Sequence, residues 1–314
     1  MRIGWTGFSA VVAAVTLAGA VAITGQGQAP AGGRQGAAAP PAGRQGGAPA
    51  APRPQAQVGG RTEDGKPNLN GVWQALTSAN WDIEAHQAEP GPHPEILGAW
   101  GAQPGGMGIV EGGAIPYKPE GLRKKQDNLK NRTLVKVTND PHRFDTADPE
   151  LQCYRPGVPR ANYMPFPFQI FQNKEQIMIV YEYKGSMRTV FMEKHQDAPV
   201  DSWMGWSNGR WEGDTLVIDV TGFNGHQWLD RAGNFFSDTA KVVERWTPRG
   251  ANHLMYEATI EDPAVYTRPW KISFPIYRRL EPNAQLVEFN CVPFVEEMMY
   301  APIGLYNPPN RSSR

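Results

Sequence analysis

The sequence predicts a mainly β protein whose principal unit is an antiparallel barrel of about eight strands. The first observation is the run 215–221, where a turn containing Gly213 leads into β-branched residues with large apolar side chains at alternate positions. The second is that runs of similar build recur at hairpin spacing through the last half of the chain. Because about eight strands suffice to close a small barrel and remove exposed edges, we expect a closed sheet.

The N-terminal part of the folded chain predicts one strand, a long excursion and one short helix. Turn residues precede the short apolar run 72–76, and the element Gly71-Val72-Trp73 resembles the entry strand of lipocalin-like (calycin-type) barrels. Pro and Gly crowd residues 89–121, which is typical of an ordered loop without regular structure. The sequence then favours a helix over 119–131, beginning with a proline.

The later strands are expected one after another, with short connections except for 222–239. Residues 165–171 are expected as an extended entry segment, whose prolines confine it to an edge or a loop. A short connection at 184–186 that contains a glycine predicts a hairpin between the runs on either side. This order predicts a near up-and-down arrangement. The expected strands are 72–76, 176–183, 187–193, 215–221, 240–247, 253–261, 270–277 and 285–291.

Composition divides the chain into five parts. Residues 1–25 have the build of a secretory signal peptide, which predicts an exported protein, periplasmic or extracellular. The alternative is an uncleaved membrane anchor, for which the apolar run is near the lower length limit. Residues 26–60 consist almost entirely of Ala, Gly, Pro, Gln and Arg, which predicts a disordered linker. We expect the strand, loop and helix of 61–152 to pack on an antiparallel barrel at 153–300, before a flexible tail at 301–314.

Charge and cysteine content narrow the classes of function. Four arginines precede residue 61, so 31 basic and 31 acidic residues leave a net charge of about −4 for the remainder. A mildly acidic body argues against nucleic-acid binding, which needs clustered Lys and Arg. Cys153 and Cys291 predict a disulfide that ties the start of the β-region to its last strand and adds roughly 4–5 kcal/mol. The alternative, a pair of metal thiolates, lacks the spacing of a metal site.

The β-region also contains an ordered set of short motifs, which together with their surroundings span roughly residues 61–295. The motifs are Arg155-Pro156-Gly157-Val158-Pro159-Arg160, Pro165-Phe166-Pro167-Phe168-Gln169-Ile170, Trp203-Met204-Gly205, Gly209-Arg210-Trp211-Glu212-Gly213-Asp214-Thr215-Leu216-Val217, Trp228-Leu229-Asp230-Arg231-Ala232-Gly233, Glu261-Asp262-Pro263 and Thr267-Arg268-Pro269-Trp270. This set resembles a large family of secreted, uncharacterised proteins from soil-type bacteria. The resemblance implies an exported β-rich protein and supplies no activity to carry over.

Three positions depart from the pattern of the resembled family. Its members commonly carry Gly-His-Ser where this chain has Gly205-Trp206-Ser207, and often a His where it has Phe235-Phe236. They usually carry Cys-x-Glu-Asn where this chain has Cys291-Val292-Pro293-Phe294. Each change replaces a potential metal ligand or acid/base group with an apolar one. The resemblance therefore implies that any metal-assisted or acid/base chemistry at these positions is altered or lost here.

The loop 224–231 holds the best candidates for acid/base chemistry. His226 could transfer a proton while Asp230 orients it, and Arg231 could bind an anionic group. The structural alternative is an ion pair between Asp230 and Arg231 that fixes the loop and leaves His226 in solvent.

Carboxylates on the later strands form a second group of candidates, and the predicted catalytic residues are His226, Asp230 and Glu244. Glu244 and Glu257 could project into one interior, where neighbouring carboxylates share protons. The alternative is cross-strand pairing with Arg245 or Lys241 on a solvated face. Further carboxylates follow at Glu261 and Asp262. We expect no metal and no cofactor, because the histidines lack any ligand spacing: His142, His195, His226 and His253.

Aromatic side chains in the connections predict a ligand-binding surface. Most aromatic residues of the β-region are expected in the core, because large apolar side chains dominate burial. At the mouth of a barrel, aromatic residues from the connections would line an apolar pocket, with Asp230 and Arg231 as polar anchors. Five aromatic residues fall in connections: Trp203, Trp206, Trp228, Phe235 and Phe236.

Three hypotheses of function follow. The first is an exported envelope protein that binds a small apolar or aromatic molecule in its barrel, with no nucleic acid and no membrane contact beyond an uncleaved signal segment. The second is an enzyme on the same scaffold, a hydrolase, lyase or isomerase that uses His226 with Asp230 or Glu244. The third is an envelope interaction protein that presents residues 90–118 to a protein partner of unknown identity.

Overall fold

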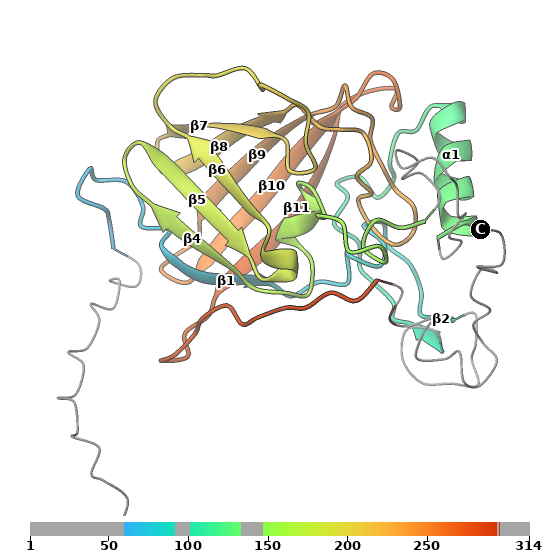
Figure 1. Cartoon of the computed structure of the whole chain (residues 1–314), viewed down its shortest axis with the longest axis horizontal. Coiled ribbons are helices and arrows are strands. Elements are labelled where there is room, and N and C mark those ends of the chain that lie inside the picture. Colours follow the sequence, from blue (N-terminus) through green and yellow to red (C-terminus); the bar gives the residue numbers. More distant parts are fainter. Residues whose placement is uncertain (1–59, 92–100, 133–146, 294, 296–314) are drawn as a thin grey trace, which may run out of the picture. The chain divides into compact units, whose positions relative to one another are not determined.

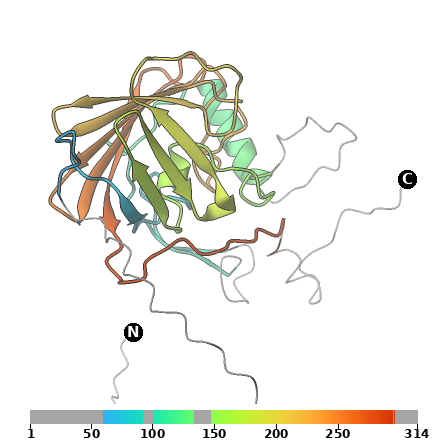
Figure 2. The same cartoon turned by 60° about the vertical axis from the view of Figure 1, so that its left-hand side comes forward.

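A closed β-barrel forms the core of the described chain (Figures 1 and 2). The structure is a computed structural model, and it describes residues 60–91, 101–132, 147–293 and 295. In this part, nine strands follow one another around the wall in the order β1-β11-β10-β9-β8-β7-β6-β5-β4, and β4 pairs with β1 to close it. The strands are β1 Gly71–Ala75, β4 Phe168–Gln172, β5 Gln176–Tyr181, β6 Met187–Phe191, β7 Trp206–Glu212, β8 Thr215–Thr221, β9 Lys241–Pro248, β10 His253–Glu261 and β11 Trp270–Arg278. The prediction of a β-barrel of about eight strands is confirmed.

One neighbouring pair in the wall departs from the expected up-and-down antiparallel order. Strands β6 and β7 run parallel, and only two residue pairs join them, Val190 with Ser207 and Phe191 with Asn208. A parallel pair needs a connection that returns the chain to the same end of the sheet. The segment 192–205 supplies that return, so the ladder between β6 and β7 is the shortest in the barrel.

Strands β4 and β7 occupy wall positions that the sequence did not predict as barrel strands. Residues 165–171 were expected as an edge or loop, but their prolines precede most of β4 and leave its ladder to β5 intact. Strand β7 was not predicted because its sequence lacks an alternating apolar pattern. Gly209 at its centre lets β7 approach β6 closely, since a Cβ there would lie 2.6 Å from Val190 Cγ1.

The strands alternate as the sequence predicted, with one face turned into the barrel. On β9, Val242, Glu244 and Trp246 are fully buried while the residues between them are partly exposed. Aromatic rings contact one another across the interior, with Phe168 edge-on to Trp246 at 5.9 Å and Trp246 edge-on to Tyr256 at 5.0 Å. The described interior is therefore packed by side chains around a polar centre.

The excursion between β1 and β4 contributes a short helix and a small sheet. Helix α1 spans Pro119–Lys130, which confirms the helix predicted from 119 to 131. It packs on the barrel loops, with Lys118 N donating to Val265 O at 2.9 Å and Asn128 Nδ2 donating to Gly233 O at 3.0 Å. The two-stranded sheet pairs β2 Glu89–Pro90 with β3 Ala102–Gln103, and 3₁₀ turns lie at η1 Arg160–Asn162 and η2 Tyr183–Gly185.

The strand predicted at 285–291 is wrong. Figure 1 shows the chain after β11 running past the barrel as an extended segment without strand pairing. The reason is that β1 already pairs with both β11 and β4, so the closed wall has no free edge to accept another strand. Contacts with side chains hold the segment instead. The ring centroids of Phe289 and Phe166 are 4.8 Å apart, and the main-chain N–H of Val287 donates to Glu182 Oε2 at 2.9 Å.

The predicted disulfide between Cys153 and Cys291 is confirmed, with a Cα–Cα distance of 5.7 Å. It ties the segment before η1 to the extended segment after β11, and not to a last strand. The signal peptide at 1–25, the tail at 301–314 and all but the last residue of the linker lie outside the described residues. None of the described helices is long and apolar enough to span a membrane.

Candidate functional site

An ion pair between Arg188 and Glu244 lies inside the barrel. Arg188 comes from β6 and Glu244 from β9, and two contacts of 2.6 and 3.1 Å join their charged groups. Asn162 Nδ2 and Tyr256 Oη also donate to Glu244 Oε1, at 2.9 and 2.7 Å. Tyr181 Oη in turn donates to Asn162 Oδ1 at 2.8 Å. Burial disfavours the cation, but Glu244 outweighs it and raises the pKa of Arg188 above its ordinary value, so the guanidinium stays charged.

A cavity of about 360 Å³ opens the wall beside this ion pair. It lies where the β6–β7 ladder stops, between residues 187–189 of β6 and residues 203–206, and we call it the β6–β7 cavity. Arg188 and Ser207, which point into the barrel, and Phe191 and Trp206, from the outer side, line the same space. The cavity therefore reaches from the surface to the interior ion pair.

Two buried donors at this cavity are unsatisfied. Among the described residues, neither Arg188 Nε nor Trp206 Nε1 has a hydrogen-bond partner, although both atoms are buried. A buried donor without an acceptor costs roughly 1–3 kcal/mol. Both residues line the cavity, so an acceptor that reached either N–H group would remove this cost.

Stacked aromatic rings form the apolar part of the same cavity. Trp206 stacks on Phe191 with ring centroids 4.7 Å apart, and Trp203 stacks on Tyr154 at 5.0 Å with an angle of 8° between the planes. The stacking fixes the orientation of both indoles. Arg155 adds an exposed guanidinium to the lining, which contains no acidic residue.

The other three aromatic residues predicted as ligand-binding belong to the core. Trp228, Phe235 and Phe236 are buried, and Phe236 packs on Phe223 at 4.8 Å. These buried rings fix the 222–239 connection to the hydrophobic core. The predicted aromatic set is therefore divided, with Trp203 and Trp206 at the β6–β7 cavity and the rest in the core.

The polar residues of the 222–239 connection have separate surroundings. Asp230 is completely buried and accepts hydrogen bonds from Ile83 N at 2.9 Å and from Asn234 Nδ2 at 2.6 Å. The His226 ring lies beside Trp203, with centroids 5.9 Å apart. Glu244 is held in the barrel interior by its own partners. The three predicted catalytic residues thus lie in three environments: a buried turn, the neighbourhood of Trp203 and the barrel interior.

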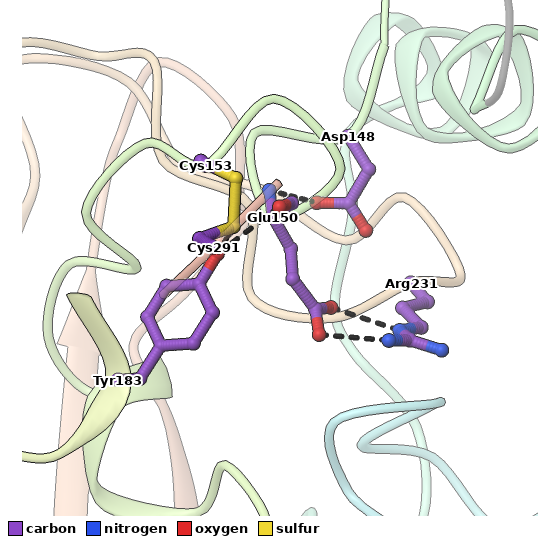
Figure 3. The surroundings of a disulfide bond; sticks show 6 residues. All are labelled: Asp148, Glu150, Cys153, Tyr183, Arg231 and Cys291. Atoms are coloured by element: carbon purple, nitrogen blue, oxygen red, sulfur yellow. Dashed lines mark hydrogen bonds and ion pairs between the residues drawn. A yellow bond between two sulfur atoms is a disulfide. The ribbon is translucent and has the colours of Figure 1, made fainter. Parts of the chain in front are cut away.

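Arg231 forms its ion pair with Glu150 (Figure 3). The ion pair with Asp230 that was expected as the structural alternative is therefore wrong. Two hydrogen bonds of 2.8 Å join the Arg231 guanidinium to the carboxylate, and Arg160 Nη2 donates to the same carboxylate at 2.6 Å. Burial disfavours the charged carboxylate, but Arg231 and Arg160 outweigh it and lower the pKa of Glu150 to about 2. The Glu150 main chain lies close to the disulfide, where its carbonyl accepts a hydrogen bond from Tyr183 Oη.

Glu257 does not share the barrel interior with Glu244, and this part of the second group of candidates is wrong. The alternation on β10 turns Tyr256 and Ala258 inward, so Glu257 lies on the outer face, opposite Arg245 and 3.1 Å from Lys271 Nζ. Glu261 is exposed. Asp262 is buried and accepts hydrogen bonds in a turn: from Ser237 N, Ser237 Oγ and Ala264 N. The alternative foresaw the outer face correctly for Glu257, but its ion-pair partner is Lys271 and not Arg245 or Lys241.

No group of three or more His, Cys, Asp or Glu residues suited to a metal ion occurs in the described ranges. Comparison of the chain with protein-family profiles, with curated proteins and with solved structures gives no match. The function therefore has to be inferred from the geometry of the molecule.

The sequence-based predictions missed Arg188, Arg155 and Phe191 at the β6–β7 cavity. A signal for Arg188 existed, because it stands two residues before Val190 on a strand with alternating burial, and so shares its inward face. No comparable signal marks Arg155, which reaches the cavity from the segment after Cys153. Its position depends on contacts between distant parts of the chain.

Proposed function

We propose that the chain binds a small aromatic molecule with an acidic or other acceptor group in the β6–β7 cavity. The observation that carries this proposal is the combination, in one cavity, of stacked indole walls and two buried donors without partners, Trp206 Nε1 and Arg188 Nε. A volume of about 360 Å³ falls in the range of small-molecule sites.

The cavity's charge supports an anionic ligand. Arg155 and Arg188 line it without an acidic residue, and within the described ranges only Arg188 has a carboxylate partner, Glu244 behind it. A carboxylate on the ligand would accept from the donors, while its ring would stack between the walls. Arg155 and Arg188 replace the polar anchoring expected from Asp230 and Arg231, since Asp230 binds Asn234 and Arg231 binds Glu150 away from this cavity.

Calorimetric titration with four probes tests the proposal. Indole-3-acetate and benzoate carry a ring and a carboxylate, whereas 3-methylindole and toluene are matched rings without the acceptor. We expect saturable binding of the two acids and weaker binding of the two uncharged rings. Absence of saturable binding by all four probes would refute the proposal.

A matched pair of tryptophan variants locates the site. Trp206→Phe keeps a stacking ring but removes the N–H, so we expect binding of the acids to weaken about three- to tenfold. Trp211→Phe changes a tryptophan of the same strand that lies outside the cavity, near Lys66, and should leave binding unchanged. Equal effects of the two substitutions would contradict the assignment of the cavity.

We also propose that the protein acts after export, in the periplasm or outside the cell. The disulfide is consistent with an oxidising compartment, and the first 25 residues have the composition of a signal peptide. Mass spectrometry of the chain expressed at full length in a bacterial host should find a mature N-terminus near residue 25 in the exported fraction. An intact N-terminus with free cysteines in the cytosol would contradict this.

A further inference from the structure

A second cavity, of about 460 Å³, lies between helix α1 and the segment after β1, and we call it the α1 cavity. Lys125 and Lys130 line it from α1, and Arg132 and Arg231 line it from the chain after α1 and from the long loop. Its acidic lining residues are Asp82 and Glu89. No residue of the β6–β7 cavity takes part, so this is a separate site.

Two of the cations that line this cavity, Lys125 and Lys130, are available to an anion. Arg231 is neutralised by Glu150, but neither Lys125 nor Lys130 forms an ion pair with any residue that the structure describes. Arg231 lies over the ring of Trp81 at 4.5 Å, which holds its guanidinium at the wall. Clustered Lys and Arg side chains in a concave, partly desolvated site favour oxyanions.

A pair of carboxylates stands at the inner wall. Asp82 lines the cavity and Asp230 lies buried behind it, and Asn234 Nδ2 bridges them, at 3.4 Å from Asp82 Oδ1 and 2.6 Å from Asp230 Oδ2. Tyr117 Oη donates to Asn234 Oδ1 at 3.0 Å, which fixes the amide with its NH₂ group toward the two acids. Two carboxylates that share one amide in a buried setting repel each other.

Burial, together with this repulsion, keeps a proton on the pair near neutral pH. Burial, with the charge of Asp82 as the next cause, raises the pKa of Asp230 to about 7, and burial also raises the pKa of Asp82. The two groups titrate as a pair and not separately. Other titratable groups act on Asp82 as well: His86 and Glu89 on its own segment, and Lys125 on α1.

We propose that the α1 cavity binds the oxyanion group of a small molecule and that binding is accompanied by uptake of a proton on the Asp82–Asp230 pair. The cations attract the anion, and the proton on the pair reduces the repulsion between its carboxylates and an oxygen of the anion. The added negative charge favours the protonated pair further, so the proton comes from solvent and no covalent bond forms. Binding therefore tightens as pH falls through neutrality.

Titration calorimetry with sulfate and acetate tests this, because neither probe titrates near pH 7. Repeating each titration in buffers with different ionisation enthalpies gives the number of protons taken up. We expect an uptake of a fraction of a proton at pH 7 and weaker binding at higher pH. Binding of acetate alone would assign the site to carboxylates, and binding of sulfate alone would assign it to tetrahedral oxyanions such as phosphate esters.

Three variants complete the test. Lys125→Ala should weaken binding of the probes about tenfold, whereas Lys124→Ala, a neighbour whose ammonium lies over Phe235 at 4.6 Å, should not. Asp82→Asn should retain binding but remove the proton uptake. No binding of either probe, equal effects of the two lysine variants, or a pH-independent affinity of the unsubstituted protein would each overturn the proposal. The pH dependence is measured on the unsubstituted protein, so it tests the proposal even if a variant does not fold.

Discussion

Replacing Glu150 by Gln should destabilise the protein strongly at neutral pH and hardly at all in acid. The carboxylate is nearly inaccessible and binds the guanidinium groups of Arg160 and Arg231 at 2.6 and 2.8 Å. Glutamine keeps the shape and removes the charge. Arg160 retains its second partner, Asp148, at 2.9 Å, so the main loss is the attraction between Glu150 and its two cations.

The magnitude follows from the pKa of Glu150. Its value is lowered from 4.5 to about 2, and each pH unit of such a difference corresponds to about 1.4 kcal/mol, so the charged form contributes about 3 kcal/mol. Because the folded pKa is the lower one, this stabilisation is present above about pH 4.5 and is lost as the pH falls toward 2. The free energy of unfolding of Glu150→Gln should therefore be lower by about 3 kcal/mol at pH 7, with the difference fading below pH 4.

Urea unfolding followed by tryptophan fluorescence, at several pH values with the disulfide intact, measures this difference. The matched control is Glu212→Gln, which removes a carboxylate from an exposed pair with Arg210 and Arg245 and should change stability little. A loss that is below 1 kcal/mol at pH 7, or that stays the same from pH 7 to pH 2, would refute the reasoning.

Three further predictions concern stability. Reducing the disulfide, which closes a loop of 138 residues, should lower the free energy of unfolding by about 5 kcal/mol in denaturant titrations with and without reductant; an unchanged midpoint would contradict this. Glu244→Gln should cost about 3–5 kcal/mol, because it leaves the buried charge of Arg188 without its partner; a loss no larger than that of Glu257→Gln on the outer face would contradict it. The raised pKa of Asp230 means that its protonated form contributes stability below about pH 4, and that this contribution is lost as the pH rises to about 7. Asp82→Asn, which removes the neighbouring charge, should therefore reduce the fall in stability between about pH 4 and pH 7. An identical pH profile for the unsubstituted protein and Asp82→Asn would exclude this coupling.

The features that the sequence predicted correctly are those set by local patterns. Alternation of apolar residues, as at Val242 and Trp246, depends on the two-residue period of a strand and needs no knowledge of the partner strand. The proline at the start of α1 marks a helix N-terminus by itself. The disulfide followed from an even number of cysteines in a chain predicted to be exported.

The errors arose where contacts with distant segments of the chain decide the structure. The segment 285–291 has residues suited to a strand, but a strand needs an edge, and the pairing of β1 with β4 and β11 removes it. Strand β7 shows the reverse case, since its polar sequence gives no strand signal and its neighbours β6 and β8 supply the ladders. Glu150 was missed because its partners, Arg160 and Arg231, come from segments that meet only in the folded chain.

The location of the β6–β7 cavity follows from one topological event that local patterns do not encode. A hairpin keeps two strands paired along their length, whereas the return segment 192–205 brings β7 beside β6 in parallel and pairs them at only two positions. The wall beyond Val190 is then open, and the inward-facing Arg188 becomes reachable from outside. Trp206, where the resembled family commonly carries His, stands at this opening. The short ladder thus accounts for the position of the cavity, and the ion pair with Glu244 accounts for the buried charge of Arg188 at its inner end.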